Sequence, residues 1–213
     1  MPDQVYGIYG AVNTVLCSLC SGPLGTHLNA IALTRGQSTY DGIPCFWGQT
    51  HGAGQTWGLT GCPTNPEGVT FTDFVTGAGS DLNPQAVFLT TTQRPYRYYE
   101  ARTTSYWVPA GYLPNPNGIP FTQLAAGQSN GNLKVIGLSS DGLPYLFYQN
   151  SNGTWSWGGA LPNPLNLQFT AVAASTTNFH LVQVILLGAD GLVYEIYQTG
   201  SGAWIWYGRL PTA

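Results

Sequence analysis

The chain has 213 residues with a formal net charge of −3, and only 7% of its residues are charged. Its six basic side chains are too few for the cation-lined groove that displaces counterions from nucleic acid, and no apolar run approaches the ~18 residues of a membrane helix. We therefore expect neither nucleic-acid binding nor membrane insertion. With 28 glycines, 15 prolines and 13% aromatic residues, the composition favours an all-β protein with one domain.

Residues 1–15 precede the repeats described below. They contain an apolar patch without a basic start, which is a poor signal peptide, so the sequence leaves the compartment unknown; secreted or extracellular action is compatible with it. The segment 6-YGIYGAV-12 is similar to 204-WIWYGRL-210 near the C-terminus. We expect residues 1–15 to form an extra strand that packs on the last unit, closes a ring, or reaches a neighbouring chain.

Four successive units then repeat one pattern with a period of ~49 residues. Each unit has four runs: two apolar runs, an Asp-Gly turn, a third run, and a fourth run that carries tryptophan. In the second unit Gln93-Arg94 replaces the Asp-Gly turn. The first three runs lie at 16–21, 28–33 and 44–49; at 71–76, 85–90 and 95–100; at 121–126, 133–138 and 144–149; and at 169–174, 181–187 and 193–198. Asp-Gly between apolar runs is a strong hairpin signal, and 144-PYLFYQ-149 alternates as a strand does.

Four short strands joined by tight turns make up one blade of a β-propeller, and the repeat length fits such a blade. We therefore predict an all-β fold, a β-propeller of four four-stranded blades. The predicted blades are residues 16–65, 66–115, 116–164 and 165–213. Two alternatives stay open, because four blades can close a ring alone or be completed by a second chain in a homo-dimer.

The four cysteines fall in the first third of the chain. Cys17 and Cys20 are close, but a zinc site needs a second close pair, so we expect no metal and no cofactor. Cys45 and Cys62 fall almost opposite each other across the hairpin 44–62, where a disulfide is sterically allowed if the Cα atoms come within about 7 Å. Cys17 and Cys20 would lie on opposite faces of a strand as buried free thiols.

Two phrases, 141-DGLPYLFYQNSNGTWSWGGALP-162 and 190-DGLVYEIYQTGSGAWIWYGRLP-211, resemble the repeats of the tectonin-type and Photorhabdus-lectin-type β-propellers. The resemblance covers residues 16–213 and is strongest in the last two units. It implies a sugar-binding protein with several equivalent pockets between blades, often for fucose-type or methylated sugars. The family's aromatic positions correspond here to Trp155, Trp157, Trp204, Trp206, Tyr148 and Tyr197. Gly48, Gln55 and Ser105 depart from the pattern in the first two units.

Sugars present an apolar C–H face and a hydroxyl edge, so flat aromatic rings beside a few polar groups suit them. The tryptophans at 57, 107, 157 and 206 recur at spacings of 50, 50 and 49 residues. The predicted sugar-binding residues are Trp57, Trp107, Trp157, Trp206, Trp155, Trp204, Tyr99, Tyr148, Tyr197, Gln149, Gln198 and Glu100. Each tryptophan can instead pack between blades, and each glutamine can instead close a turn.

The sequence therefore predicts a multivalent, non-catalytic lectin whose partners are glycans or glycoconjugates. Repetition suits a lectin because several weak sites gain avidity, whereas an enzyme needs one asymmetric site. Glycoside hydrolysis usually requires two facing carboxylates, and three of the nine acidic residues, Asp41, Asp141 and Asp190, belong to the Asp-Gly turns. We predict no catalytic residues. The alternatives are a protein-interaction scaffold, which would present one larger patch, and a glycosidase.

Overall fold

The computed structural model describes residues 13–21, 28–35, 42–49, 57–62, 68–79, 83–101 and 106–211. These residues form sixteen strands in four antiparallel sheets of four strands each, and the strands follow one another in chain order within every sheet. No helix in this part of the chain is long and apolar enough to cross a membrane.

We name the sheets A to D in chain order. Sheet A contains β1 (Asn13–Ser21), β2 (Leu28–Arg35), β3 (Pro44–Gln49) and β4 (Trp57–Gly61). Sheet B contains β5 (Phe71–Ala78), β6 (Pro84–Thr90), β7 (Pro95–Glu100) and β8 (Trp107–Tyr112). Sheet C contains β9 (Phe121–Ser129), β10 (Asn132–Ser139), β11 (Pro144–Gln149) and β12 (Trp155–Ala160). Sheet D contains β13 (Phe169–Thr176), β14 (Val182–Gly188), β15 (Val193–Gln198) and β16 (Trp204–Arg209).

Each sheet is a meander whose turns are set by local chemistry. The turns between the second and third strands place Gly142 and Gly191 at φ 79° and 78°, the left-handed region that glycine adopts without a steric penalty. Gln93 takes the same conformation in sheet B, with φ 61°. β1 begins at Asn13, before the predicted start of the first unit. Residues 1–12, which hold the rest of the predicted N-terminal strand, lie outside the described residues.

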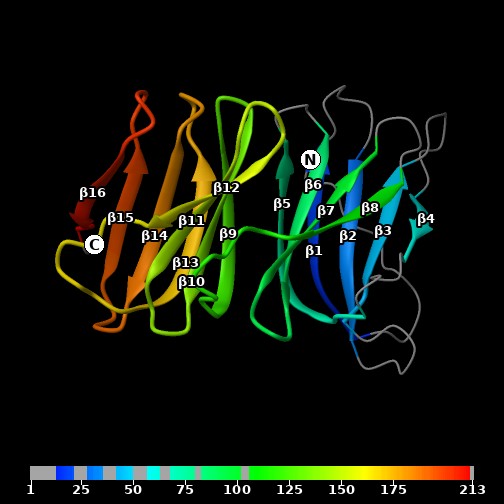
Figure 1. Ribbon diagram of the computed structural model, residues 1–213, viewed down its shortest axis with the longest axis horizontal. Coiled ribbons are helices and arrows are strands. Elements are labelled where there is room, and N and C mark those ends of the chain that lie inside the picture. The colour runs from blue at the N-terminus through cyan, green and yellow to red at the C-terminus, as the bar shows by residue number, and fades with distance from the viewer. Residues whose placement is uncertain are drawn as a thin grey trace.

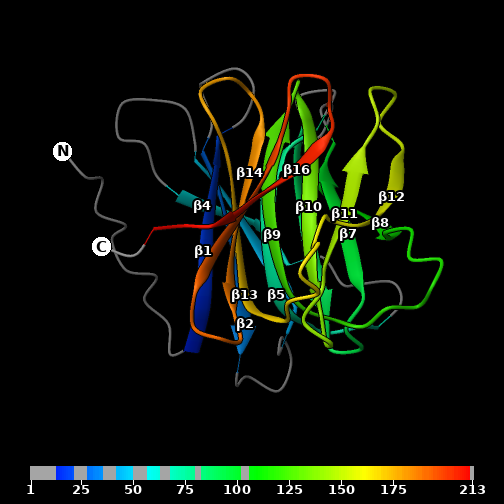
Figure 2. The same cartoon turned by 90° about the vertical axis from the view of Figure 1, so that its left-hand side faces the viewer.

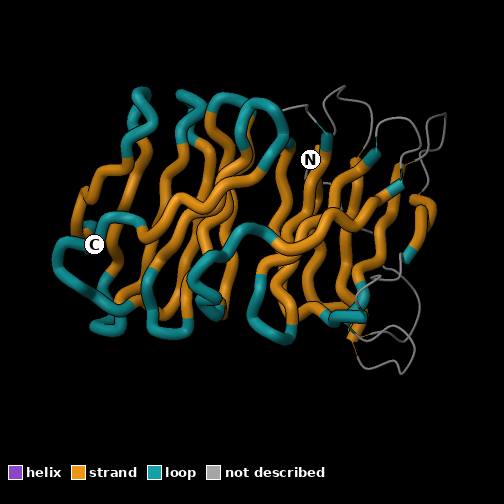
Figure 3. Tube along the Cα trace, viewed as in Figure 1, coloured by secondary structure: helices purple, strands orange, loops and turns teal. Residues whose placement is uncertain are grey.

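The four sheets follow one another in a row, from sheet A on the right of Figure 1 to sheet D on the left. The strands run roughly vertically in the same view (Figure 3), across the direction of the row. The first strand of each sheet contacts the first strand of the next: β1 with β5, β5 with β9, and β9 with β13. Figure 2 looks along the row from the end formed by sheet D. Because sheets A and D lie at opposite ends in Figure 1, the described residues of the chain do not close a four-bladed ring, which was one of the two sequence alternatives.

Apolar side chains fill the space between neighbouring sheets, and their removal from water drives the stacking. Between sheets A and B lie Ile31, Phe46, Phe71, Phe74, Ala86, Phe88, Tyr96, Tyr98 and Trp107. Between B and C lie Val87, Leu89, Leu113, Phe121, Leu124, Leu133, Val135 and Phe147. Between C and D lie Ile136, Leu138, Leu146, Leu161, Phe169, Val182, Val184, Leu186, Tyr194 and Ile196. Sheets B and C are therefore covered on both faces.

A recurring hydrogen bond also joins each sheet to the next. The carbonyl of a turn residue accepts the N–H of the phenylalanine that begins the following sheet, at 2.9 Å in each case. The pairs are Gly42 with Phe71, Gln93 with Phe121, and Gly142 with Phe169. The same turn thus reverses the chain within one sheet and positions the next sheet.

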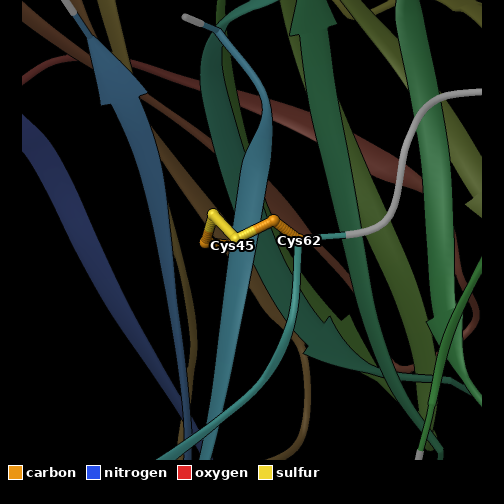
Figure 4. The surroundings of a disulfide bond; sticks show 2 residues. All are labelled: Cys45 and Cys62. Carbon is orange, nitrogen blue, oxygen red and sulfur yellow. A yellow bond between two sulfur atoms is a disulfide. The ribbon is translucent and has the colours of Figure 1, made fainter. Parts of the chain in front are cut away.

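The disulfide predicted for Cys45 and Cys62 is present, with the two Cα atoms 4.2 Å apart. It joins β3 to the residue that follows β4 (Figure 4) and so ties the outer strand of sheet A to its neighbour. The side chains of Cys17 and Cys20, both on β1, lie outside the described residues, and the prediction that they are free thiols stays a prediction.

Candidate functional site

The fourth strands show which tryptophans are equivalent. Each strand starts with a tryptophan opposite the last residue of the third strand; these pairs are Trp57 with Gln49, Trp107 with Glu100, Trp155 with Gln149, and Trp204 with Gln198. The sequence spacing instead grouped Trp157 and Trp206 with Trp57 and Trp107, and that grouping is wrong. It failed because the connections between strands differ in length from unit to unit, so an even spacing does not preserve the register.

Trp157 and Trp206 form a second position, two residues further along the strand. They lie opposite Phe147 and Ile196. Trp157 stacks on Tyr145 of its own sheet at 5.3 Å between ring centroids, and Trp206 stacks on Tyr194 at 5.5 Å. Both rings are only partly buried, so one part of each supports its own sheet and another part stays accessible.

Trp107 has a packing role. It is buried and stacks at 4.4 Å on Phe46 of sheet A, with 15° between the ring planes. Phe46 therefore occupies the ring face that a ligand would need. The side chain of Trp57 lies outside the described residues, and Glu100 is half-buried at the end of β7.

The two predicted glutamines close turns. Gln149 and Gln198 are buried, and their Nε2 atoms donate to the carbonyls of Gly153 and Gly202 at 3.2 and 3.3 Å. This is the turn role that the sequence left open as an alternative to sugar binding. The Oε1 atom of Gln198 is buried and has no hydrogen-bond partner among the described residues, so it can still accept a hydrogen bond.

At the interface of sheets C and D, a cation and three aromatic rings occur together. Lys134 lies directly opposite Tyr148 on the neighbouring strand, and its Nζ is 5.0 Å from the centre of the tyrosine ring. Burial lowers the pKa of Lys134 below that of a free lysine. Tyr148 from sheet C and Trp204 and Trp206 from sheet D pack on the same apolar cluster.

The interface of sheets B and C has a similar arrangement, but its cation lies on the same strand as the tyrosine. The Arg97 guanidinium lies 5.6 Å from the ring centre of Tyr99, and Trp155 and Trp157 of sheet C pack, partly buried, on the cluster between the sheets. The Trp155 Nε1 is buried and has no hydrogen-bond partner within the part of the chain that the structure describes. Gln85, opposite Tyr99 in the register, has a buried Oε1 in the same state.

Sheet D carries a third set, on a face that no other sheet of the described residues covers. Gln183 lies opposite Tyr197, as Lys134 lies opposite Tyr148, and its Nε2 donates to the Glu195 Oε1 at 2.7 Å. The Tyr197 ring meets Tyr207 edge-on at 6.5 Å. Tyr148, Tyr99 and Tyr197 thus hold the same place in three successive sheets.

The carboxylates of the turns are already engaged. Asp190 accepts hydrogen bonds from the Tyr194 hydroxyl at 2.6 Å and the Leu192 N–H at 3.0 Å, and these bonds lower its pKa. Asp141 accepts a hydrogen bond from the Ser139 hydroxyl. Among the described residues, no group of three or more histidine, cysteine, aspartate or glutamate side chains could hold a metal ion.

Sequence reasoning missed Lys134, Arg97 and Gln85. Lys134 is the one lysine of the chain, and it stands inside an apolar run. A basic residue at such a position, opposite an aromatic residue of the next predicted strand, was the available signal. Arg97 sits two residues before Tyr99 on the same strand, so the two side chains lie on one face of the sheet, and that spacing was its signal.

No protein-family model matches the sequence, and no curated protein matches it. Solved structures do match, and they show that the chain has the β-propeller fold. The BP39L lectin from Burkholderia pseudomallei superposes with a TM-score of 0.65 and 18% identity, over 92% of this chain and 55% of that one. A fungal lectin from Aleuria aurantia, described as a six-bladed β-propeller with a novel fucose recognition mode, gives 0.60 and 12%, over 92% and 63%.

An engineered GH43 glycoside hydrolase with endo-xylanase and exo-arabinofuranosidase activity also matches, with a TM-score of 0.56 and 11% identity, over 100% of this chain and 42% of that one. The chain therefore spans about half to two thirds of the length of the two lectins and less of the hydrolase. Because the fold occurs in lectins and in an enzyme, the function has to be argued from the side chains.

Proposed function

We propose that this chain is a non-catalytic lectin that binds sugars at the interfaces between neighbouring sheets. One observation carries the proposal: two successive interfaces present similar sets of side chains, although the cations come from different positions, with Gln85 in the place of Lys134. Each set has a cation beside a tyrosine on one sheet, Arg97 with Tyr99 or Lys134 with Tyr148, and two partly buried tryptophans on the next sheet.

The chemistry of each set suits a sugar ring. The tryptophans offer a flat apolar surface for the C–H face, and the cation donates hydrogen bonds to hydroxyl oxygens. At the interface of sheets B and C, the unpartnered Trp155 N–H and Gln85 carbonyl oxygen add a donor and an acceptor. Two sets on one chain support multivalent binding, which raises the affinity for a surface that carries many copies of a sugar.

We propose fucose-type or methylated sugars as ligands. Their methyl groups add apolar surface that stacks on aromatic rings, and the fucose recognition named for the Aleuria aurantia lectin supports this choice. The resemblance of the last two repeats to tectonin-type and Photorhabdus-lectin-type propellers supports the same class of ligand.

The similarity to the GH43 hydrolase makes glycoside hydrolysis the second candidate. Hydrolysis needs an acid and a second carboxylate on either side of one bond. Asp141 and Asp190 are held in turns, and Glu195 accepts a hydrogen bond from Gln183 at the end of the row. This distribution favours binding without hydrolysis.

The test is a glycan array with the labelled chain, followed by titration of the sugars that bind. The Lys134→Met variant keeps the apolar stem and removes the charge; because a charged hydrogen bond contributes about 1.5–3 kcal/mol, we expect affinity at that site to fall roughly tenfold or more. Arg94→Met is the matched control. The Arg94 guanidinium lies 4.1 Å from the Tyr112 ring centre, but no pair of tryptophans belongs to that contact, so binding should not change.

Binding to a narrow group of sugars, weakened by Lys134→Met and not by Arg94→Met, supports the proposal. An empty array, or equal effects of the two variants, contradicts it. Release of sugar from the bound glycans would instead establish the hydrolase alternative.

A further inference from the structure

The outward face of sheet D exposes apolar side chains. Along β14, β15 and β16 the burial alternates: one set packs on sheet C, and the other set faces away from it. The exposed fractions on the second set are 39% for Leu187, 38% for Val193, 39% for Ile205 and 62% for Tyr207. Exposed apolar patches of this kind mark interaction surfaces on soluble proteins.

The equivalent face of sheet C is covered. Leu138 stands 49 residues before Leu187 and has the same place beside the turn, since Leu138 lies opposite Pro144 and Leu187 opposite Val193. Leu138 is only 1% exposed because sheet D packs on it. The face of sheet D thus has the composition of a sheet interface but no neighbour among the described residues.

The turn glycines show the same difference. A Cβ atom at Gly142 would lie 2.9 Å from the backbone N and O of Phe169, the residue that begins sheet D. At Gly191, the equivalent glycine in sheet D, such an atom would meet nothing within 4 Å. No described residue occupies, beside Gly191, the place that the first strand of sheet D occupies beside Gly142.

We propose that this face of sheet D is the docking surface for sheet A of a second copy of the chain. The sheet A of that copy then stacks on sheet D in the same way as sheet D stacks on sheet C. Among the described residues, sheet A is the other sheet of the row that has a neighbouring sheet on one side only, as Figure 1 shows. The stacking then continues a type of interface that the chain already forms three times. The lectin chains that share the fold are longer than this chain, so the fold itself extends beyond four sheets.

Docking would also complete a third sugar site, and this part of the inference rests on the proposed function. Gln183, Glu195 and Tyr197 form the half that one sheet supplies. The other half comes from the fourth strand of the next sheet. In sheet A the register places Trp57 opposite Gln49, where sheet D has Trp204 opposite Gln198.

The first experiment measures the mass of the 213-residue chain in solution by light scattering. We expect at least twice the single-chain mass of 22.8 kDa. Leu187→Lys combined with Ile205→Lys places two charges on the face and should return the mass to that of one chain. Leu165→Lys combined with Phe179→Lys is the control, because these side chains are 62% and 82% exposed but lie in turns; it should leave the mass unchanged.

A single-chain mass for the natural sequence overturns the inference, and so does an assembly that the face variant leaves intact while its circular dichroism shows a folded chain. A mixing experiment tests the order of the sheets. The labelled Leu187→Lys, Ile205→Lys chain still has a natural sheet A that can dock on the sheet D face of another chain. When it is mixed with unlabelled natural chain, the label should therefore elute at the mass of the assembly. Failure to do so would indicate that two sheet D faces pair with each other, which contradicts the proposed order.

The sugar part has a separate readout. In an assembly in which every sheet D face is docked, Tyr197→Ala should keep the assembled mass and lower the number of sugars bound per chain by about one third, from three sites to two. An unchanged number contradicts the third site. If no sugar binds at all, the proposed function fails, while the mass measurements still decide whether the chains dock.

Discussion

Replacement of Trp155 by phenylalanine separates the two roles that this residue has in the structure. The indole ring packs on the cluster between sheets B and C, and its Nε1 is buried without a hydrogen-bond partner in the described parts of the chain. Phenylalanine keeps an aromatic ring at this position and removes the N–H. The variant therefore tests whether the N–H is costly in the free protein and useful in the bound one.

Two opposing terms set the expected stability. The smaller ring loses roughly 40 Å² of buried apolar surface, which costs about 1 kcal/mol at ~25 cal/mol per Å². Removal of an unsatisfied buried donor recovers about 1–3 kcal/mol. The free energy of unfolding of Trp155→Phe should thus equal or exceed that of the natural protein by up to about 2 kcal/mol. Affinity for the sugar should fall about fivefold, the value of one neutral hydrogen bond.

Trp204→Phe is the matched control, since Trp204 has the same place in sheet D and its Nε1 is not among the buried unpartnered atoms of the described residues. It should lose about 1 kcal/mol of stability. Urea unfolding followed by circular dichroism measures both variants, and isothermal titration measures the sugar. Equal destabilisation of the two variants would refute the argument that the Trp155 N–H is an unpaired donor.

Three further outcomes follow from the contacts. Hydrogen bonds from Tyr194 and Leu192 lower the pKa of Asp190. Its carboxylate therefore stabilises the fold above about pH 4, and that contribution is lost as the pH falls through the lowered pKa. Asp190→Asn should remove this contribution and flatten the acid side of a plot of unfolding free energy against pH. A Cβ at Gly127 would lie 3.0 Å from the Ser175 carbonyl oxygen of sheet D, so Gly127→Ala should lower the melting temperature, with a cost of about 1–3 kcal/mol. Loss of the disulfide through Cys62→Ser should cost about 2–4 kcal/mol in urea unfolding, and an unchanged midpoint would contradict its stabilising role.

The residues of the proposed sugar sites were only partly predictable. The sequence indicated Tyr148 and Tyr99 correctly as members of repeated positions, because a strand alternates its side chains and the repeat shows where each strand lies. It did not indicate Lys134 or Arg97, whose importance depends on which ring lies beside them across the sheet. It also could not tell that Phe46 of sheet A covers Trp107, because that contact joins two different sheets.

What the sequence determined by itself is local. The strands of the third runs, the glycine turns at 142 and 191, and the disulfide within one hairpin all depend on residues close together in the chain, and their patterns predicted them. The tertiary structure decided the rest. Whether the sheets close a ring depends on the angle at which each stacks on the next, and which tryptophans remain accessible depends on the packing between sheets. The stacking angle and the accessibility of each tryptophan both depend on many contacts between residues that are distant in the chain, and no short sequence pattern specifies them.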